Sequence, residues 1–509
     1  MRVPTRIVLA SMVALVVGLS PMTVGQTAQA IIPPDIPGAA AQTSARESSA
    51  TKPRADERPN VIVIVTDDQS ANLMAVMTKT RALLGGHGIT FDNAHATTPT
   101  CCPARATLLT GEPAGQTGVW TNWTPYGGWE VFRQGGAEDR TFVRKLDEAG
   151  YTTALMGRYL NGYAIPTARE EYAGTVDYVP QGWDVWHSFA LPPDPPPGAR
   201  HQAYFDYWLM NSTNGGRDVD YSYQGTSPRF YSTDYLAARA ASLIRTTPRE
   251  DPLFILYAPF APHGPYTAAP RHRKERLPQV PVPGYNQVAG KPEWIRERSP
   301  LAPQAGPNLV RKQQRTLLAV DDAVASIVRT LRSTDRLDNT LLLFTSDNGL
   351  AQGQFRLIDS KNWPYVTAVP FILRWDARIK KDGALAGSTD NRLVSLSDVA
   401  STVLSAAGLP HDSEESLDLL DRSQARPELL IGAWRNRGEN PRMPAYCGIR
   451  NERWMYVRYS EGTEELYQIA RDPAMLRNLA SDPSSKPTLH RLRAMTRDQC
   501  VPTPPGFAW

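Results

Sequence analysis

The stretch Val61-Ile62-Val63-Ile64-Val65-Thr66-Asp67-Asp68-Gln69 decides the fold of this 509-residue chain. It starts with an unbroken run of β-branched residues, which is typical of a strand buried on both faces of a parallel sheet. Two later runs, Leu253–Tyr257 and Leu341–Phe344, have the same character. Between them lie stretches with helical spacing of apolar residues, such as Gln314 to Leu331. This alternation predicts an α/β fold, with a mainly parallel central sheet sandwiched by helices.

Polar residues follow two of these predicted strands. The first strand leads into Asp67 and Asp68, and the third leads into Asp347 and Asn348. In open α/β sheets, ligands bind just beyond the carboxyl ends of the strands, so these side chains are expected to converge. Three carboxylates and one amide oxygen suit Ca²⁺, with Mg²⁺ as the alternative. A helix N-cap and a tight turn also explain such pairs, but their matching positions favour a metal site.

The most specific motif lies between the first two strands. It reads Thr98-Pro99-Thr100-Cys101-Cys102-Pro103-Ala104-Arg105-Ala106-Thr107-Leu108-Leu109-Thr110-Gly111. This segment resembles the signature of the formylglycine-dependent sulfatases of the alkaline phosphatase superfamily, Cys-x-Pro-x-Arg followed by Leu-Thr-Gly. The resemblance implies that a separate maturation enzyme oxidises Cys101 to the aldehyde formylglycine. Ala104 stands where many members carry serine. The alternative for Cys101 and Cys102 is an ordinary disulfide or a buried thiol.

The resemblance also implies a reaction, the hydrolysis of a sulfate ester. A hydrated aldehyde carries two hydroxyls, so one can attack sulfur while the other later expels sulfate and re-forms the carbonyl. A divalent metal would lower the pKa of the attacking hydroxyl, and nearby cations would balance the charge of the transition state. The expected substrate is a sulfated small molecule or glycan, for an arylsulfatase or a sugar sulfatase.

Three cationic residues match the family pattern in order along the chain, and a fourth departs from it. Arg105 closes the signature and supports the aldehyde residue, His263 corresponds to the sulfate-contacting histidine, and Lys361 corresponds to the leaving-group lysine. Arg158 stands where the family usually has lysine. Arginine keeps the charge and offers a fork to sulfate, but it cannot shuttle a proton. With Cys101, these residues form the predicted catalytic set.

The base that starts sulfate release is open at the level of sequence. Leu160 stands where many arylsulfatases have histidine, and Gly115 and Thr117 stand where glucosamine-6-sulfatases have histidines. None of these three side chains accepts a proton, which leaves His263 as the expected base.

Flanking segments place the resemblance nearest the branch of N-acetylglucosamine-6-sulfatases and heparan endosulfatases. They are Gly182-Trp183-Asp184-Val185-Trp186, Tyr231-Ser232-Thr233-Asp234-Tyr235 and Glu465-Leu466-Tyr467 with Asp472-Pro473. Fold and core chemistry do not fix the substrate. Two alternatives therefore stay open: a phosphodiesterase or phosphonate hydrolase of the same superfamily, and a secreted glycan-binding protein without catalysis, in which Cys101 stays a thiol.

The start of the chain has the pattern of an exported protein. Residues 1–30 contain Arg2 and Arg6, a short apolar run and the ending Ala28-Gln29-Ala30, which predicts a signal peptide cleaved near Ala30. An uncleaved membrane anchor is the alternative, although the apolar run is short for a spanning helix. Export predicts a secreted or extracytoplasmic protein without stable membrane insertion.

Composition divides the rest of the chain. Residues 31–57 have the Ala, Pro, Ser and Thr content of a flexible leader. Residues 58–424 are predicted to form the catalytic α/β domain. Residues 425–509, with short apolar and aromatic runs, are predicted to form a smaller antiparallel sheet with a terminal helix.

Charge and cysteine content limit the possible partners. The formal net charge of +4 includes Arg2 and Arg6, which leaves +2 after signal-peptide removal and gives no indication of a nucleic-acid partner. The four cysteines lack the spacing of a zinc site. In an exported protein, Cys447 and Cys500 are the expected disulfide.

Overall fold

The computed structural model describes residues 58–164, 177–200, 203–381, 385–411, 413, 415–434 and 443–509. The predicted signal peptide and leader, residues 1–57, lie outside this part of the chain. Within the described ranges, no helix is both long and apolar enough to cross a membrane.

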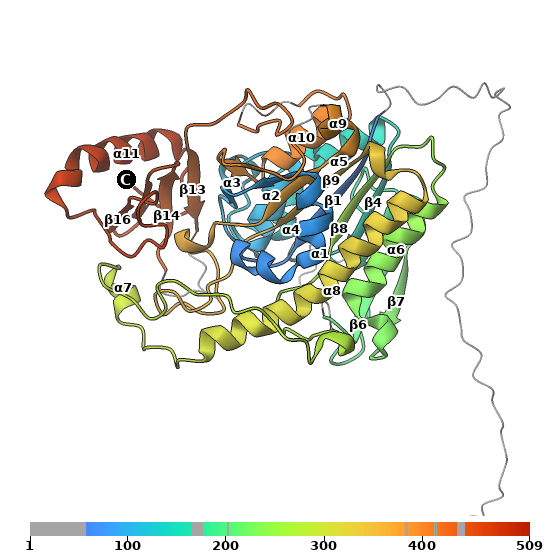
Figure 1. Ribbon diagram of the computed structural model, residues 1–509, viewed down its shortest axis with the longest axis horizontal. Coiled ribbons are helices and arrows are strands. Elements are labelled where there is room, and N and C mark those ends of the chain that lie inside the picture. Colours follow the sequence, from blue (N-terminus) through green and yellow to red (C-terminus); the bar gives the residue numbers. More distant parts are fainter. Residues whose placement is uncertain are drawn as a thin grey trace, which may run out of the picture. The chain divides into compact units, whose positions relative to one another are not determined.

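A ten-stranded sheet forms the centre of the fold (Figure 1). In spatial order its strands are β11 (Ser388–Asp390), β2 (Ile89–Phe91), β10 (Phe371–Arg374), β9 (Thr340–Ser346), β1 (Asn60–Thr66), β8 (Leu253–Ala258), β4 (Thr152–Gly157), β5 (Val185–Phe189), β6 (Tyr207–Ser212) and β7 (Asp220–Gln224). The run from β9 through β1, β8 and β4 to β5 is parallel. Antiparallel strands border it on both sides. The predicted fold class is confirmed, and the three predicted strands are β1, β8 and β9.

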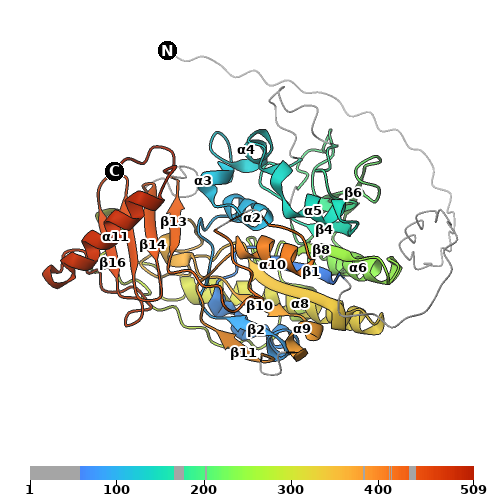
Figure 2. The same ribbon diagram turned by 90° about the horizontal axis from the view of Figure 1, so that it is seen from above.

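Helices cover both faces of this sheet, as expected. The helices in the described part of the chain are α1 (Thr78–Leu83), α2 (Cys101–Thr110), α3 (Ala114–Thr117), α4 (Gly128–Gln134), α5 (Phe142–Glu148), α6 (Ser232–Thr246), α7 (Glu293–Arg296), α8 (Ala305–Ser333), α9 (Asp376–Lys381), α10 (Asp398–Ala406) and α11 (Lys486–Gln499). Of these, α7 and α11 contribute to cores of the second sheet described below. Alternate residues of β1 point to opposite faces: Val63 belongs to a core with α2, α5 and α10, and Ile64 belongs to a core with α6 and α8. Figure 2 shows the two helical layers above and below the sheet.

Helix α8 is longer than the sequence pattern predicts. It begins at Ala305, near the end of the proline-rich stretch 278–307. Pro307 lies in its first turn, where the missing N–H would have no intrahelical partner in any case. The short helix α7 also lies in this stretch.

A second, antiparallel sheet lies toward the end of the chain, as predicted. Its strands, in spatial and chain order, are β13 (Leu429–Ala433), β14 (Tyr446–Arg450), β15 (Met455–Tyr459) and β16 (Glu464–Tyr467). Leu489 and Leu492 of α11 pack in one core with strand residues such as Ile449. A separate core joins other strand residues to Trp363 and Tyr365 of the segment that follows β9. The boundary between residues 424 and 425 lies in the segment before β13 and stays a prediction.

The cysteines divide into two pairs. Cys447 of β14 and Cys500, directly after α11, form a disulfide across 53 residues. Cys101 and Cys102 are both free and buried, so the disulfide alternative for them is absent from the structure. One further pair of short strands, β3 (Ala94–His95) and β12 (Val394–Ser395), lies outside both sheets.

Candidate functional site

The predicted site residues meet at the carboxyl edge of four neighbouring parallel strands. Thr66 of β1 pairs with Ser346 of β9, so the residues that follow these two strands lie side by side. The loops after β9, β1, β8 and β4 carry the following predicted residues: Asp347, Asn348, Asp67, Asp68, His263 and Arg158. The convergence expected from the strand ends is therefore observed.

The carboxylates form a compact, buried group. Asp67, Asp68 and Asp347 offer oxygens that lie within 4.8 Å of one another and of the Cys101 thiol. Asp347 Oδ1 accepts hydrogen bonds from the backbone N–H groups of Asp68, at 3.0 Å, and Asn348, at 2.8 Å. Asn348 Nδ2 donates to Asp68 Oδ1 at 2.6 Å. Asn348 Oδ1 is buried without a hydrogen-bond partner among the described residues, so an acceptor oxygen is available beside the carboxylates.

This donor set fits a hard divalent cation. Such ions take carboxylate and amide oxygens as ligands, and the site offers both types in one buried group. Three carboxylates this close repel one another unless cations balance them.

Helix α2 brings the cysteine to the carboxylates. Cys101 is its first residue, and Arg105 lies one turn later on the same side of the helix. The Cys101 Sγ atom lies 3.5 Å from Asp67 Oδ1 and 2.8 Å from Lys361 Nζ. The N–H of Cys102 donates to Asn122 Oδ1 at 2.9 Å, which fixes the start of the helix.

Each carboxylate faces a cationic side chain. Arg158 pairs with Asp67, and Lys361 Nζ donates to Asp68 Oδ1 at 2.8 Å. Arg105 Nε donates to Asp347 Oδ2 at 2.9 Å, and its Nη1 donates to the Arg158 carbonyl at 3.0 Å. The guanidinium of Arg105 thus ties the strand ends of β9 and β4 to α2.

Burial and charge set the protonation of the group. Burial opposes ionisation of Asp67, but the surrounding positive charges, that of Arg158 first, outweigh burial and hold the pKa of Asp67 well below its usual range. Burial, followed by the neighbouring charge of Asp67, raises the pKa of Asp347 to about 6. Burial also raises the pKa of the Cys101 thiol well above its ordinary value. An unmodified Cys101 is therefore a neutral thiol and a weak nucleophile.

His263 is the accessible member of the site. Its side chain is 31% exposed, against 9% for Lys361. Its Nε2 lies 3.6 Å from Asp68 Oδ2, and its Nδ1 lies 2.8 Å from the Gly264 carbonyl oxygen. Because Nδ1 faces a carbonyl, it carries the proton, and Nε2 is the nitrogen directed at the carboxylates.

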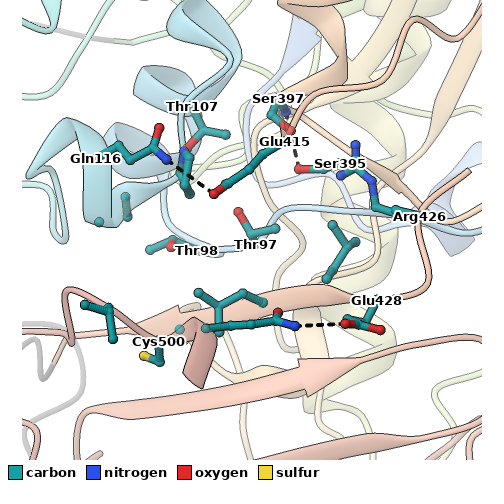
Figure 3. A pocket seen from close by; sticks show the side chains of 18 of the residues that line it. Thr97, Thr98, Thr107, Gln116, Ser395, Ser397, Glu415, Arg426, Glu428 and Cys500 are labelled. Carbon is teal, nitrogen blue, oxygen red and sulfur yellow. Dashed lines mark hydrogen bonds between the residues drawn. The ribbon is translucent and has the colours of Figure 1, made fainter. Parts of the chain in front are cut away.

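The other positions considered for the base lie elsewhere or carry no titratable group. Leu160 is buried. Gly115 lines a cavity of about 520 Å³ between α3, α2 and the β13 side of the second sheet. Figure 3 shows other residues that line this cavity, such as Gln116 and Glu415. Thr117 lies two residues after Gly115 in α3. None of the predicted catalytic or metal-binding residues lines this cavity. Within it, Gln116 donates to Glu415 at 3.3 Å.

Two asparagines outside the predicted set of site residues hold the catalytic segments in place. Asn122 accepts from the Cys102 N–H, and Asn161 Oδ1 accepts from Arg158 Nη2 at 2.9 Å. Both lie in irregular segments, where asparagine is a common turn residue. Their role depends on contacts with other segments, so no local pattern signals it.

Comparison with known proteins gives consistent matches. The family pattern described as Sulfatase matches residues 59–409. Human N-acetylglucosamine-6-sulfatase is 32% identical over 363 residues, which cover 69% of this chain and 61% of that protein. The extracellular sulfatase SULF-1 homologue of Drosophila melanogaster is 31% identical over 389 residues, which cover 73% of this chain and 31% of that protein. The chain thus matches less than two thirds of either relative's length.

A solved structure shares the fold. It is a protein in complex with its substrate, D-glucosamine-2-N,6-O-disulfate, and it superposes with a TM-score of 0.70 at 20% identity. The match covers 87% of this chain and 98% of that one.

Proposed function

This chain belongs to the sulfatase family, and we propose that it hydrolyses a sulfate ester, with residue 101 in its formylglycine form as the nucleophile. One observation carries the proposal: the side chain of Cys101 lies among Asp67, Asp68, Asp347 and Lys361 at the carboxyl edge of the sheet. The thiol is neutral by its pKa, so the unmodified residue is poorly suited to this position. An aldehyde hydrate supplies both an attacking oxygen and a second hydroxyl that can expel the sulfate.

We propose that Asp67, Asp68, Asp347 and Asn348 hold a divalent cation, with Ca²⁺ favoured and Mg²⁺ as the alternative. The unpartnered Asn348 Oδ1 and the clustered carboxylates support this assignment. When bound, the cation would supply positive charge to the attacking oxygen and to the sulfate.

The cationic side chains have separate proposed tasks. Arg105 and Arg158 hold the carboxylates in place, because both guanidinium groups are buried and engaged with Asp347 and Asp67. The Nζ of Lys361 lies 2.8 Å from the Cys101 Sγ atom, so its positive charge can stabilise the negative charge that develops around this side chain and on the sulfate. The family resemblance assigns Lys361 the further task of protonating the leaving oxygen. These fixed charges face the place where negative charge develops during attack on sulfur.

His263 is the proposed base for sulfate release. It is the accessible titratable group of the site, and its Nε2 is directed toward Asp68. Leu160 cannot accept a proton, and Gly115 lies in the separate cavity. His263 would remove the proton from the second hydroxyl, so that the aldehyde re-forms as sulfate leaves.

The proposed substrate is a sulfated sugar. This choice rests on the human relative, named for N-acetylglucosamine-6-sulfate chemistry, and on the solved structure with a sulfated glucosamine. The name of the fly relative supports an extracellular location, in line with the predicted signal peptide. Formation of the aldehyde would require a maturation enzyme as a partner before secretion.

The first test compares Cys101→Ala with Cys102→Ala. Cys102 is also buried and free, but replacing it keeps the cysteine, proline and arginine of the signature. We expect Cys101→Ala to lose at least about 10⁴-fold in kcat, because the nucleophile is absent, and Cys102→Ala to stay within about tenfold of the wild type. The measurement is hydrolysis of glucosamine-6-sulfate and 4-nitrophenyl sulfate, with the matched phosphodiester as the competing activity.

Peptide mass spectrometry completes the test. The wild-type peptide with residue 101 should be about 18 Da lighter than its thiol form, as expected for conversion to the aldehyde. Full turnover by Cys101→Ala would overturn the proposal. Faster hydrolysis of the phosphodiester would reassign the enzyme to the phosphodiesterase alternative, and an unmodified thiol with glycan binding but no turnover would favour the binding-protein alternative.

A further inference from the structure

Two large aromatic side chains are exposed on one loop between α3 and α4. Trp123 is 48% exposed and Tyr126 is 42% exposed, and they lie three positions apart. Large aromatic side chains usually gain stability by burial, so two exposed ones in a single loop indicate a binding surface. Neither residue has a role in the reaction proposed above.

This loop is attached to the catalytic segments at both ends. Asn122, next to Trp123, accepts a hydrogen bond from the Cys102 N–H at 2.9 Å. On the other side, the N–H of Trp129 donates to the Asn161 carbonyl at 2.7 Å, and the Asn161 side chain accepts from Arg158. Because Asn122 is bonded to the Cys102 N–H, standard bond lengths place the Cα of residue 123 within roughly 13 Å of the Cα of residue 101. The aromatic pair is therefore next to the reaction centre but outside it.

Backbone hydrogen bonds within the loop fix the backbone that carries the two aromatic side chains. The Trp120 N–H donates to the Tyr126 carbonyl at 2.8 Å, and the Gly128 N–H donates to the Thr121 carbonyl at 3.0 Å. A Cβ atom at Gly127 would lie 1.8 Å from the Thr121 carbonyl oxygen, so only glycine permits this closure. A loop fixed in this way loses little conformational entropy when a ligand binds.

A third ring extends the surface toward the second sheet. The rings of Tyr126 and Trp434 have centroids 5.2 Å apart and are tilted by 59°. Trp434 directly follows β13, and Figure 2 shows α3, which precedes the loop, beside that strand. The aromatic platform, defined as Trp123, Tyr126 and Trp434, thus joins the loop beside the catalytic residues to the second sheet.

We propose that the aromatic platform is a glycan subsite that binds a pyranose ring one or more units away from the sulfated sugar. The C–H groups on the face of a pyranose pack well against aromatic rings, and the sugar hydroxyls remain in water at the edges. A small aryl sulfate has no second pyranose ring that could bind there. The inference rests on the proposed function and deepens it: the preferred substrate is a sulfated oligosaccharide rather than a sulfated monosaccharide or phenol.

The test compares substrates of two sizes in three variants and a control. The substrates are a 6-O-sulfated tetrasaccharide from heparan sulfate and 4-nitrophenyl sulfate. In Trp123→Ala and Tyr126→Ala, we expect the ratio of kcat/KM for the tetrasaccharide to kcat/KM for the aryl sulfate to fall about tenfold. The fall should come from a higher KM for the tetrasaccharide. Trp123→Phe should restore most of the ratio, because it keeps an aromatic face. Tyr223→Ala, which removes a 50% exposed tyrosine from β7, should leave the ratio unchanged.

A binding measurement separates this inference from the proposed reaction. In the Cys101→Ala protein, the tetrasaccharide should quench tryptophan fluorescence, and adding Trp123→Ala should remove that change and weaken binding about tenfold. An unchanged ratio of kcat/KM in the alanine variants, including an equal loss of kcat/KM for both substrates, would overturn the aromatic platform. Undiminished tetrasaccharide binding without Trp123 would also overturn it. Failure of the reaction alone, with glycan binding still dependent on Trp123, would overturn the proposed hydrolysis and leave the subsite standing.

Discussion

The two adjacent cysteines at the start of α2 have different surroundings and therefore different chemical properties. Neighbouring residues in a helix point about 100° apart, so Cys101 faces the carboxylates while Cys102 belongs to the core between α2 and the sheet. Burial raises the pKa of Cys102 to about 12. Only Cys101 lies where an aldehyde would meet a cation site and Lys361. The two cysteines therefore differ because their side chains leave the helix in different directions.

A histidine remote from the site should govern acid stability. Burial lowers the pKa of His187 to about 4, although its hydrogen bond with Asn211 opposes the shift. An ordinary histidine in the unfolded chain has a pKa of about 6.5, so between these values the unfolded state binds the proton and the folded state does not. Stability should therefore fall by up to about 3 kcal/mol as the pH drops from about 6.5 to 4.

The measurement is urea unfolding at a series of pH values. We expect His187→Gln to be less stable than the wild type near pH 7 but to lose less further stability on acidification. His490→Gln, at an exposed position, is the matched control and should follow the wild type. An identical pH slope in wild type and His187→Gln would contradict the assignment.

At the scale of the element, α2 links the signature to the sheet. Its first residue is Cys101, its second turn begins with Arg105, and it ends at Gly111 in a left-handed conformation with φ of 78°. The positive end of the helix dipole lies at Cys101, which favours an anion such as sulfate there. The signature is thus one helix whose start, second turn and end each have a structural task.

Replacing the glycine that ends α2 should destabilise the protein without altering the chemistry. A Cβ at Gly111 would lie 3.0 Å from Ser416 Oγ and 3.2 Å from Ala400 Cβ, in addition to the cost of the positive φ. We expect Gly111→Ala to lose about 2 kcal/mol of stability in total. Gly150→Ala, with φ of 81° and open space at its Cβ, should lose only the backbone cost of about 1 kcal/mol. Equal losses in thermal or urea unfolding would show that the contact with α10 has no effect.

At the scale of the whole molecule, the second sheet supports the segment that carries Lys361. Trp363 and Tyr365 pack in the same core as Tyr446 and Tyr459. The Tyr365 hydroxyl donates to the buried Glu465 of β16 at 2.6 Å. A residue at the reaction centre is therefore positioned by packing against strands that follow it by about a hundred residues in the chain.

Metal removal should affect the stability of the whole fold as well as turnover. The three buried carboxylates repel one another, so a cation that binds the folded state alone should stabilise it, by about 2.7 kcal/mol at a hundredfold excess over Kd. We expect chelation to lower the melting temperature and abolish hydrolysis, and Ca²⁺ to restore both better than Mg²⁺. In Asp347→Asn the metal-dependent shift should shrink. A melting temperature that does not respond to chelator or Ca²⁺ would count against these residues as ligands.

The sequence by itself determined the α/β class, the signature around Cys101 and the four oxygen ligands proposed for a cation. These features are local: each strand, and the residues that follow it, is encoded in a run of consecutive residues whose burial and turn preferences can be inferred directly. The family resemblance supplied the distant residues Arg158, His263 and Lys361, but it did not supply their contacts. The structure places all of them around one group of carboxylates.

Tertiary structure alone decided how distant segments meet. The pairing of Lys361 with Asp68 joins residues 293 positions apart, and Asn122 and Asn161 gain their roles only from contacts with other segments. Packing also put Gly115 in a separate cavity and brought Tyr126 against Trp434. Local patterns record whether a side chain prefers burial or a turn, but not which distant side chain it meets, because that depends on how the whole chain packs.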